Sequence, residues 1–281
     1  MKIRTMKTTT CFLCFFFIIS CTSGKEKSYI GSTPAGNVVR SFLGIPYSDS
    51  VDFIRWKITL ANDGYKLQCN YGLSKPNTAG FINDGKKIEL NGLLRKEKNY
   101  YQLRNGNKVL WMVELNTDLV HLLDAGNRLL LGNAGWSYTL SSIQPSASDQ
   151  IHITPKQTVL KDSMAFEGRT PCFVPGIIAP GALCYKLKWY IVLYADDAMH
   201  APAAYKIFGT PYRKEGSRKG NWKLITGKDG RIIYQLNDEK GNGFLFLLKV
   251  DEHILVFTDA QGKLLTGDAD FSYTLNRTTS P

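Results

Sequence analysis

Apolar and polar side chains alternate with a period of two along much of this chain. The pattern is clearest in residues 55–60, 65–71, 88–90 and 188–193. Successive side chains of a strand point to opposite faces of the sheet, so each segment is predicted to be a β-strand with one buried and one wetter face. In residues 136–140 the same rule places Trp136, Tyr138 and Leu140 inside and Ser137 and Thr139 outside.

Turn-forming sequences separate these strands. Asn-Gly, Asp-Gly or similar pairs recur at residues 62–64, 83–85, 105–106, 124–126, 228–230, 241–243 and 261–262. Such pairs supply the positive φ angles that tight hairpins need. No segment holds a sustained 3.6-residue apolar period, and residues 115–124 have room for one helical turn at most. The pattern therefore predicts an all-β chain of antiparallel meanders.

The end of the chain repeats its middle. Residues 109–140 and 244–275 align without a gap, and Trp136-Ser-Tyr-Thr-Leu140 corresponds to Phe271-Ser-Tyr-Thr-Leu275. A long offset of this kind indicates a duplicated domain. Closing each meander removes its sheet edges, so we expect two tandem small antiparallel β-barrels, lipocalin-like or strongly curled.

The domain boundaries follow from composition. Residues 39–141 are predicted to form the first barrel, 142–160 a Ser- and Pro-containing linker, and 161–281 the second barrel. The repeats are expected to begin at Phe42-Leu43-Gly44 and at Phe166-Glu167-Gly168, each followed by a proline.

The N-terminus has the features of a targeting segment. Three positive charges precede an apolar stretch at residues 11–19 that is too short to span a bilayer. Ile18-Ile19-Ser20-Cys21 then resembles a bacterial lipobox, which predicts a signal peptide at 1–20, lipidation of Cys21 and a lipidated tether at 21–38. The alternative is an ordinary secretory signal followed by a chance cysteine.

Charge bears on the partners of this chain, and cysteine content bears on its redox compartment. Removal of residues 1–20 leaves 32 Lys and Arg against 24 Asp and Glu. The charge is spread out, and the one dense run, residues 213–219, is expected to be a solvated hairpin loop. Nucleic acid is a poor partner for an exported lipoprotein.

Besides Cys21, the exported chain retains Cys69, Cys172 and Cys184, an odd count that suggests one pair and one buried thiol. Cys69 lies on an apolar strand face, which favours the buried thiol.

Several motifs resemble one known family. Phe166-x-Gly168 leads into Arg169-Thr170-Pro171-Cys172, Pro175-Gly176-Ile177 follows, and the repeat closes with an aromatic-polar-Tyr-Thr-Leu strand. Together with the lipobox, these resemble the N-terminal domain of the NlpE-type (copper-homeostasis, CutF-like) envelope lipoproteins, more closely in residues 166–275 than in 42–140. The resemblance implies a lipocalin-like barrel with a Pro-Cys-x-x-Cys-x-Gly-Ile motif.

This chain departs from that motif. Pro175 stands where the family has its second cysteine, and the first repeat has Pro46-Tyr47-Ser48-Asp49 with no cysteine. Two interpretations remain for the cysteines. Cys172 and Cys184 either form a disulfide across a Pro- and Gly-rich loop, or contribute to a cuprous site with nearby Met164, Met199 and His200, since copper(I) prefers thiolate and thioether ligands.

Other reactive residues give weaker signals. The four histidines, 121, 152, 200 and 253, are isolated in sequence, and Asp196-Asp197 is more typical of a solvated turn than of a calcium site. No Gly-x-Ser-x-Gly, His-Glu-x-x-His or phosphate-loop motif occurs, so no catalytic residue is nominated.

These patterns lead to a functional hypothesis. We expect a non-catalytic lipoprotein of the cell envelope, anchored to the outer membrane, that senses envelope stress or binds an envelope protein or small ligand. Such a ligand is expected in a barrel mouth or between the domains. The alternatives are a copper-binding lipoprotein that uses Cys172 and Cys184, and an enzyme acting on envelope material.

Overall fold

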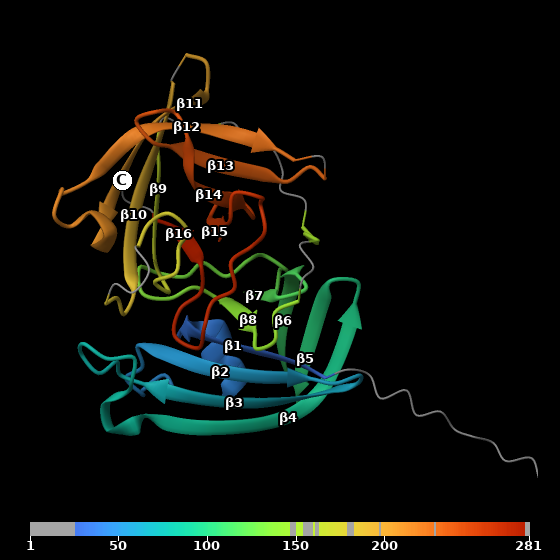
Figure 1. Ribbon diagram of the computed structural model, residues 1–281. Helices are drawn as coiled ribbons and strands as arrows, with labels where there is room; N and C mark the ends of the chain where they lie inside the picture. The colour runs from blue at the N-terminus through green and yellow to red at the C-terminus, as the bar shows by residue number, and fades with distance from the viewer. Residues whose placement is uncertain are drawn as a thin grey trace, which may run out of the picture.

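The computed structural model describes residues 26–146, 150–153, 160, 163–178, 183–196, 198–227 and 229–278. These residues form two closed eight-stranded antiparallel β-barrels in tandem (Figure 1). The all-β prediction and the two-barrel architecture are confirmed. Across the described ranges, no helix has the length and apolar character needed to cross a membrane.

In the first barrel each strand pairs with the next, and the last strand, β8, pairs with β1. Its elements are β1 (Lys27–Pro34), α1 (Asn37–Leu43), β2 (Phe53–Leu60), β3 (Gly64–Gly72), the 3-10 turn η1 (Ile82–Asp84), β4 (Lys86–Glu97), β5 (Tyr100–Asn105), β6 (Lys108–Asn116), β7 (Leu119–Leu123) and β8 (Thr139–Ser142).

The second barrel repeats this topology, with β16 closing on β9. Its elements are β9 (Ser163–Thr170), β10 (Leu187–Asp196), β11 (Ala201–Gly209), the 3-10 turn η2 (Thr210–Tyr212), β12 (Arg218–Thr226), β13 (Ile232–Asn237), β14 (Gly243–Lys249), β15 (Ile254–Thr258) and β16 (Thr274–Arg277).

The first barrel begins earlier than the sequence pattern indicated. Strand β1 lies within residues 21–38, the segment predicted as a tether, and it pairs with β2 along its whole length. The counterpart of Phe166-Glu167-Gly168 is therefore Tyr29-Ile30-Gly31, not Phe42-Leu43-Gly44. Gly31 pairs with Trp56 as Gly168 pairs with Trp189. The alternation in β1 is weak because four of its last five residues are buried.

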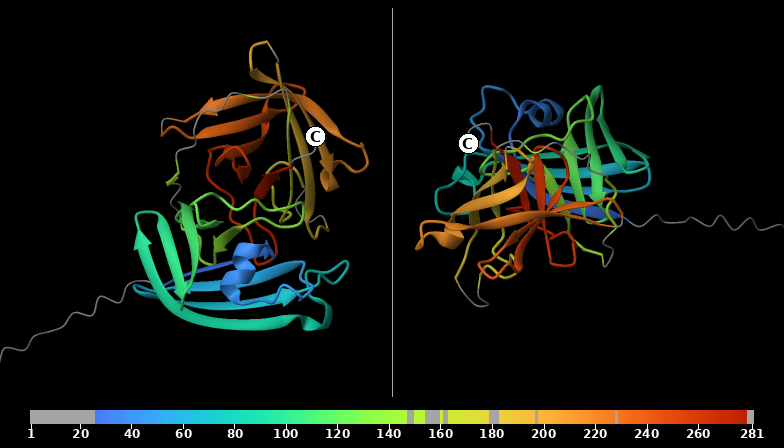
Figure 2. Two further views of the ribbon diagram at one scale, coloured as in Figure 1. Left: turned by 180° about the vertical axis from the view of Figure 1, so that it is seen from behind. Right: turned by 90° about the horizontal axis from the view of Figure 1, so that it is seen from above.

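One end of each barrel is plugged by the segment that joins its first two strands. In the first barrel this segment contains α1, the short blue helix of Figure 2. Val39, Phe42 and Leu43 of this helix lie in the barrel core. In the second barrel the described residues of this segment, 171–178 and 183–186, contain no helix, and Val174 and Ile177 pack into the core. Residues 115–124, which had room for at most one helical turn, form the end of β6, a turn and β7.

Side chains fill the interior of both barrels, as expected at this size. Trp56 and Trp189 occupy equivalent buried positions, and each indole donates a hydrogen bond to a buried threonine, Thr33 at 2.8 Å and Thr170 at 2.9 Å. The apolar strand faces predicted from alternation in β2, β3 and β10 are buried in these cores.

A third apolar cluster joins the two barrels. Leu115 and Leu119 of the first barrel pack with Val250 and Ile254 of the second, and each pair of counterparts is separated by the repeat offset of 135. Both halves thus use the same face, as in an isologous dimer interface. Ile151, in the segment predicted as a linker, bridges to Asn116 and packs against this cluster.

Polar contacts across the interface follow the same symmetry. The Gly132 amide donates to the Asn276 side chain, and the corresponding Gly267 amide donates to Ser141 Oγ, both at 2.9 Å. Thr139, which alternation placed outside, is 1 % exposed. The expectation of a solvated face there is wrong, because the second barrel covers it.

Candidate functional site

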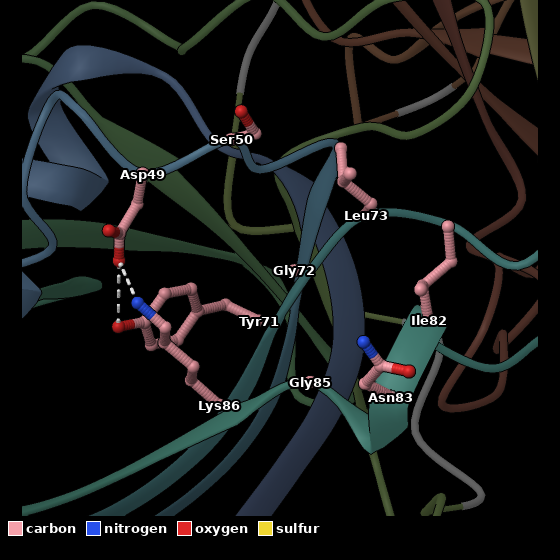
Figure 3. A pocket seen from close by; sticks show the side chains of 9 residues that line it. All are labelled: Asp49, Ser50, Tyr71, Gly72, Leu73, Ile82, Asn83, Gly85 and Lys86. Atoms are coloured by element: carbon pink, nitrogen blue, oxygen red, sulfur yellow. Dashed lines mark hydrogen bonds and ion pairs between the residues drawn. The ribbon is translucent and has the colours of Figure 1, made fainter.

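A pocket of about 280 Å³ opens beside the plugged end of the first barrel. Its walls come from residues 49–50 after α1, from residues 71–73 at the end of β3, and from the turn that enters β4 (Figure 3). This volume lies near the lower limit for small-molecule sites.

An ion pair with a tyrosine forms the polar side of the pocket. Lys86 Nζ lies 2.8 Å from Asp49 Oδ2, and the Tyr71 hydroxyl donates to the same oxygen at 3.3 Å (Figure 3). The hydrogen bond from Lys86 lowers the pKa of Asp49, and the same bond raises the pKa of Lys86. Both groups are therefore charged at neutral pH.

The opposite side of the pocket is apolar. Leu73 and Ile82 are 39 % and 43 % exposed, and Figure 3 shows both side chains standing at the rim away from Asp49. A binding molecule would meet hydrogen-bonding groups on one side and aliphatic surface on the other.

The loop between β3 and β4 is held in place by its packing. Gly85 has φ +69°, and a Cβ there would lie 2.8 Å from the Tyr71 carbonyl oxygen, which favours glycine. Phe81 in the same loop stacks on Phe53 with ring centroids 4.2 Å apart. The pocket wall is thus a well-anchored loop.

The disulfide prediction is confirmed. Cys172 and Cys184 are bonded. They close the loop that plugs the second barrel, in the place that α1 occupies in the first. The first repeat has no disulfide at this place, and α1 plugs its barrel instead.

The copper-site residues do not come together. Cys184 precedes β10, whereas Met199 and His200 follow it, so about 30 Å of strand separates them at roughly 3.3 Å per residue. Met164 is buried in β9. In the described ranges no three His, Cys, Asp or Glu side chains are placed to hold a metal ion.

Cys69 lies in the core of the first barrel, whereas Asp196 and most of the basic run at residues 213–219 lie at turns. Cys69 is a buried free thiol, as predicted, and burial raises its pKa well above the usual value. Asp196 accepts hydrogen bonds from the amides of Ala198 and Met199, which confirms a turn, while Asp197 lies outside the described residues. Most of the basic run forms the turn before β12. Cys21 also lies outside the described residues.

His121 and His152 are less isolated than their sequence positions suggest. His121 is fully buried, with Nδ1 2.9 Å from Thr139 Oγ1 and Nε2 2.9 Å from the Leu130 carbonyl oxygen. His152 Nδ1 lies 3.6 Å from Glu114, a buried carboxylate that also accepts hydrogen bonds from Tyr101 and from Lys96. Lys96, Tyr101 and His152 thus surround the Glu114 carboxylate, and we interpret this cluster as a structural polar network.

Sequence patterns did not single out the Asp49 pocket. Its residues come from three separate segments, and each looks like an ordinary turn or strand end by itself. Asp49 was noted only because it stands in the Pro-Tyr-Ser-Asp sequence that lacks the family's cysteines.

Comparison of the chain with models of known families, with curated proteins and with solved structures found no significant match. The resemblance to NlpE-type lipoproteins therefore stays a prediction that rests on the motifs quoted above.

Proposed function

We propose that this protein is a lipid-anchored envelope protein that binds a small polar ligand without transforming it. The observation that carries the proposal is the Asp49 pocket, an open site at the end of a barrel whose interior is filled. Asp49 and Lys86 offer an acceptor and a donor, and Leu73 and Ile82 offer an aliphatic surface. A molecule of monosaccharide size, with hydroxyls on one side and an apolar face on the other, suits these walls.

The proposed anchor rests on the leader and on Cys21. Two or more acyl chains hold a protein stably on a membrane, whereas one chain is marginal. The anchored barrels would then hold the Asp49 pocket in the envelope compartment, where it would meet its ligand. The NlpE-type resemblance supports the same placement.

The ligand-binding proposal is tested by thermal shift. A specific ligand raises the melting temperature by mass action. In a screen of monosaccharides, amino acids and metal ions, we expect a stabilising ligand for the wild type that fails to stabilise Asp49→Asn. The matched control is Asp63→Asn, a change at a turn between β2 and β3 that should keep the full shift. If a ligand stabilises Asp49→Asn equally, the pocket is not its site.

The anchor is tested separately. Metabolic labelling with a fatty-acid probe should mark the wild type and leave Cys21→Ala unlabelled. Equal labelling of both proteins would contradict lipidation at Cys21 and would leave the pocket proposal untouched.

A further inference from the structure

A buried arginine connects the plug of the first barrel to the Asp49 pocket. Arg40 lies in the last turn of α1 and is 8 % exposed. Its Nη1 donates to the Tyr47 carbonyl oxygen at 3.3 Å, and its Nη2 donates to the Asp49 carbonyl oxygen at 2.5 Å. The guanidinium therefore holds the main chain of the residue whose carboxylate forms the polar side of the pocket.

The segment that carries Asp49 is weakly anchored by its own side chains. Residues 46–50 form no strand or helix, and all of them except Asp49 are exposed, Tyr47 by 65 %. The Asp49 amide donates to the Pro46 carbonyl oxygen at 3.1 Å, which shapes a turn without attaching it to the barrel. In the described part of the chain, the hydrogen bonds that reach the main chain of this segment from elsewhere are those of Arg40.

The carboxylate of Asp49 is held from the other side of the pocket. Lys86 of β4 lies 2.8 Å from Oδ2, and Tyr71 of β3 donates to the same oxygen at 3.3 Å (Figure 3). The hydrogen bond from Lys86 is the main cause that lowers the pKa of Asp49, and the charge of Arg40 lowers it further. A displaced segment would lengthen the contact with Lys86 and weaken this effect. The position of the main chain thus sets the state of the carboxylate.

The plug alone does not require a guanidinium at this place. Val39, Phe42 and Leu43 of the same helix are core residues, and an apolar side chain there would avoid the cost of burying a charge. Both hydrogen bonds of the Arg40 side chain go to carbonyl oxygens, and its Nε is buried with no hydrogen-bond partner among the described residues. A buried cation with neutral and incomplete partners indicates a role beyond filling the barrel.

We propose that Arg40 is a positioning residue of the Asp49 pocket, which fixes the pocket carboxylate by clamping the Tyr47 and Asp49 carbonyl oxygens. A guanidinium presents its N–H groups in a rigid planar fork and reaches both oxygens at once, whereas a lysine ammonium is a point charge on a flexible stem. The plug helix thereby controls the geometry of the pocket beside it. This inference rests on the proposed function for the use of the pocket, and on the structure alone for the placement of Asp49.

The test measures the pKa of the Asp49 carboxyl group by carbon-13 NMR in the full-length protein without any ligand. In the wild type this pKa should lie below the usual value of an aspartate. Arg40→Met keeps the aliphatic stem and removes the fork, and it should raise the pKa by about 0.5 unit or more. Arg40→Lys should raise it nearly as much, because the charge stays but the clamp is lost.

The matched control is Arg95→Met, the same change at an exposed position of β4. Arg95 lies nine residues after Lys86, about 30 Å along the strand at roughly 3.3 Å per residue, so this variant should leave the Asp49 pKa unchanged.

Two outcomes would overturn the proposal. An unchanged Asp49 pKa in Arg40→Met would mean that the segment keeps its place without the guanidinium. A wild-type pKa in Arg40→Lys would mean that charge matters and the clamp does not, and this variant decides by itself if circular dichroism shows that Arg40→Met is unfolded. Because the titration uses no ligand, a failed ligand screen counts against the proposed function alone, and an unchanged pKa counts against the positioning role alone.

Discussion

The hydroxyl oxygens of Ser137 and Ser272 lie 2.6 Å apart, and the two serines occupy the same position in the two repeats. Two residues later, Thr139 and Thr274 are again counterparts, and their hydroxyls lie 3.0 Å apart. Contacts between equivalent residues mark a two-fold axis. The two barrels therefore meet as the subunits of a symmetric dimer would, within one chain.

The serine pair provides a direct test of this interface. Ser137→Ala and Ser272→Ala should each destabilise the protein by about 1–3 kcal/mol, since each leaves a buried hydroxyl without its partner. The double variant should lose less than the sum, with a coupling of about 0.5–1.5 kcal/mol in urea unfolding. Ser48→Ala, at an exposed position, serves as the control. Strictly additive losses would show that the hydroxyls do not interact.

His121 predicts how stability depends on pH. Burial lowers its pKa from 6.5 to about 4, so between these values the unfolded chain takes up a proton that the folded chain does not. This contribution is complete above about pH 6.5, falls as the pH drops, and is lost below about pH 4. It amounts to about 3 kcal/mol at roughly 1.4 kcal/mol per pKa unit.

The matched variant is His121→Val, because Val256 is the counterpart in the second repeat. Chemical unfolding between pH 4 and pH 7 should show a shallower pH dependence for this variant than for the wild type. Identical slopes would mean that His121 titrates normally in the folded protein.

The disulfide should stabilise the plug of the second barrel. Closing a loop over a separation of 12 residues contributes about 3 kcal/mol in the chain-entropy model. Cys172→Ser with Cys184→Ser should lower the stability by about this amount while the circular dichroism spectrum stays β-type. Cys69→Ser changes the buried thiol and leaves the bond intact, so non-reducing peptide mapping should still find the Cys172–Cys184 bridge. A bridge that includes Cys69 would refute the pairing.

Both barrels lay a tyrosine over a glycine of the next strand. Tyr65 covers Gly92, and Tyr205 covers Gly220. A Cβ on Gly92 would lie 2.0 Å from the Arg104 carbonyl oxygen and 2.6 Å from the Tyr65 ring. Gly92→Ala should therefore destabilise by about 1–3 kcal/mol through overpacking. Gly80→Ala, where the nearest atom is 3.5 Å away, should be close to neutral in the same thermal melt.

Part of this structure could be read from local patterns, because a half-buried strand needs alternating side chains whatever surrounds it. Trp56 and Ile58 in β2 and Tyr65 and Leu67 in β3 are buried where alternation placed them. The repeat of residues 109–140 implied two similar domains. For Cys172 and Cys184 the sequence left a disulfide and a cuprous site as alternatives, and the structure shows the disulfide.

Only the tertiary structure decided what the alternation leaves open. Thr139 looks like a solvent-facing strand residue, and only the second barrel makes it buried. Strand β1 has a mostly buried pattern that local rules do not recognise, so its role in closing the barrel emerges from its pairing with β2 and β8. Arg169 and Trp136 lie in different repeats, and only the symmetric packing of the two barrels places one over the other. A strand pattern reports which face is apolar, whereas a site depends on which faces of distant segments meet.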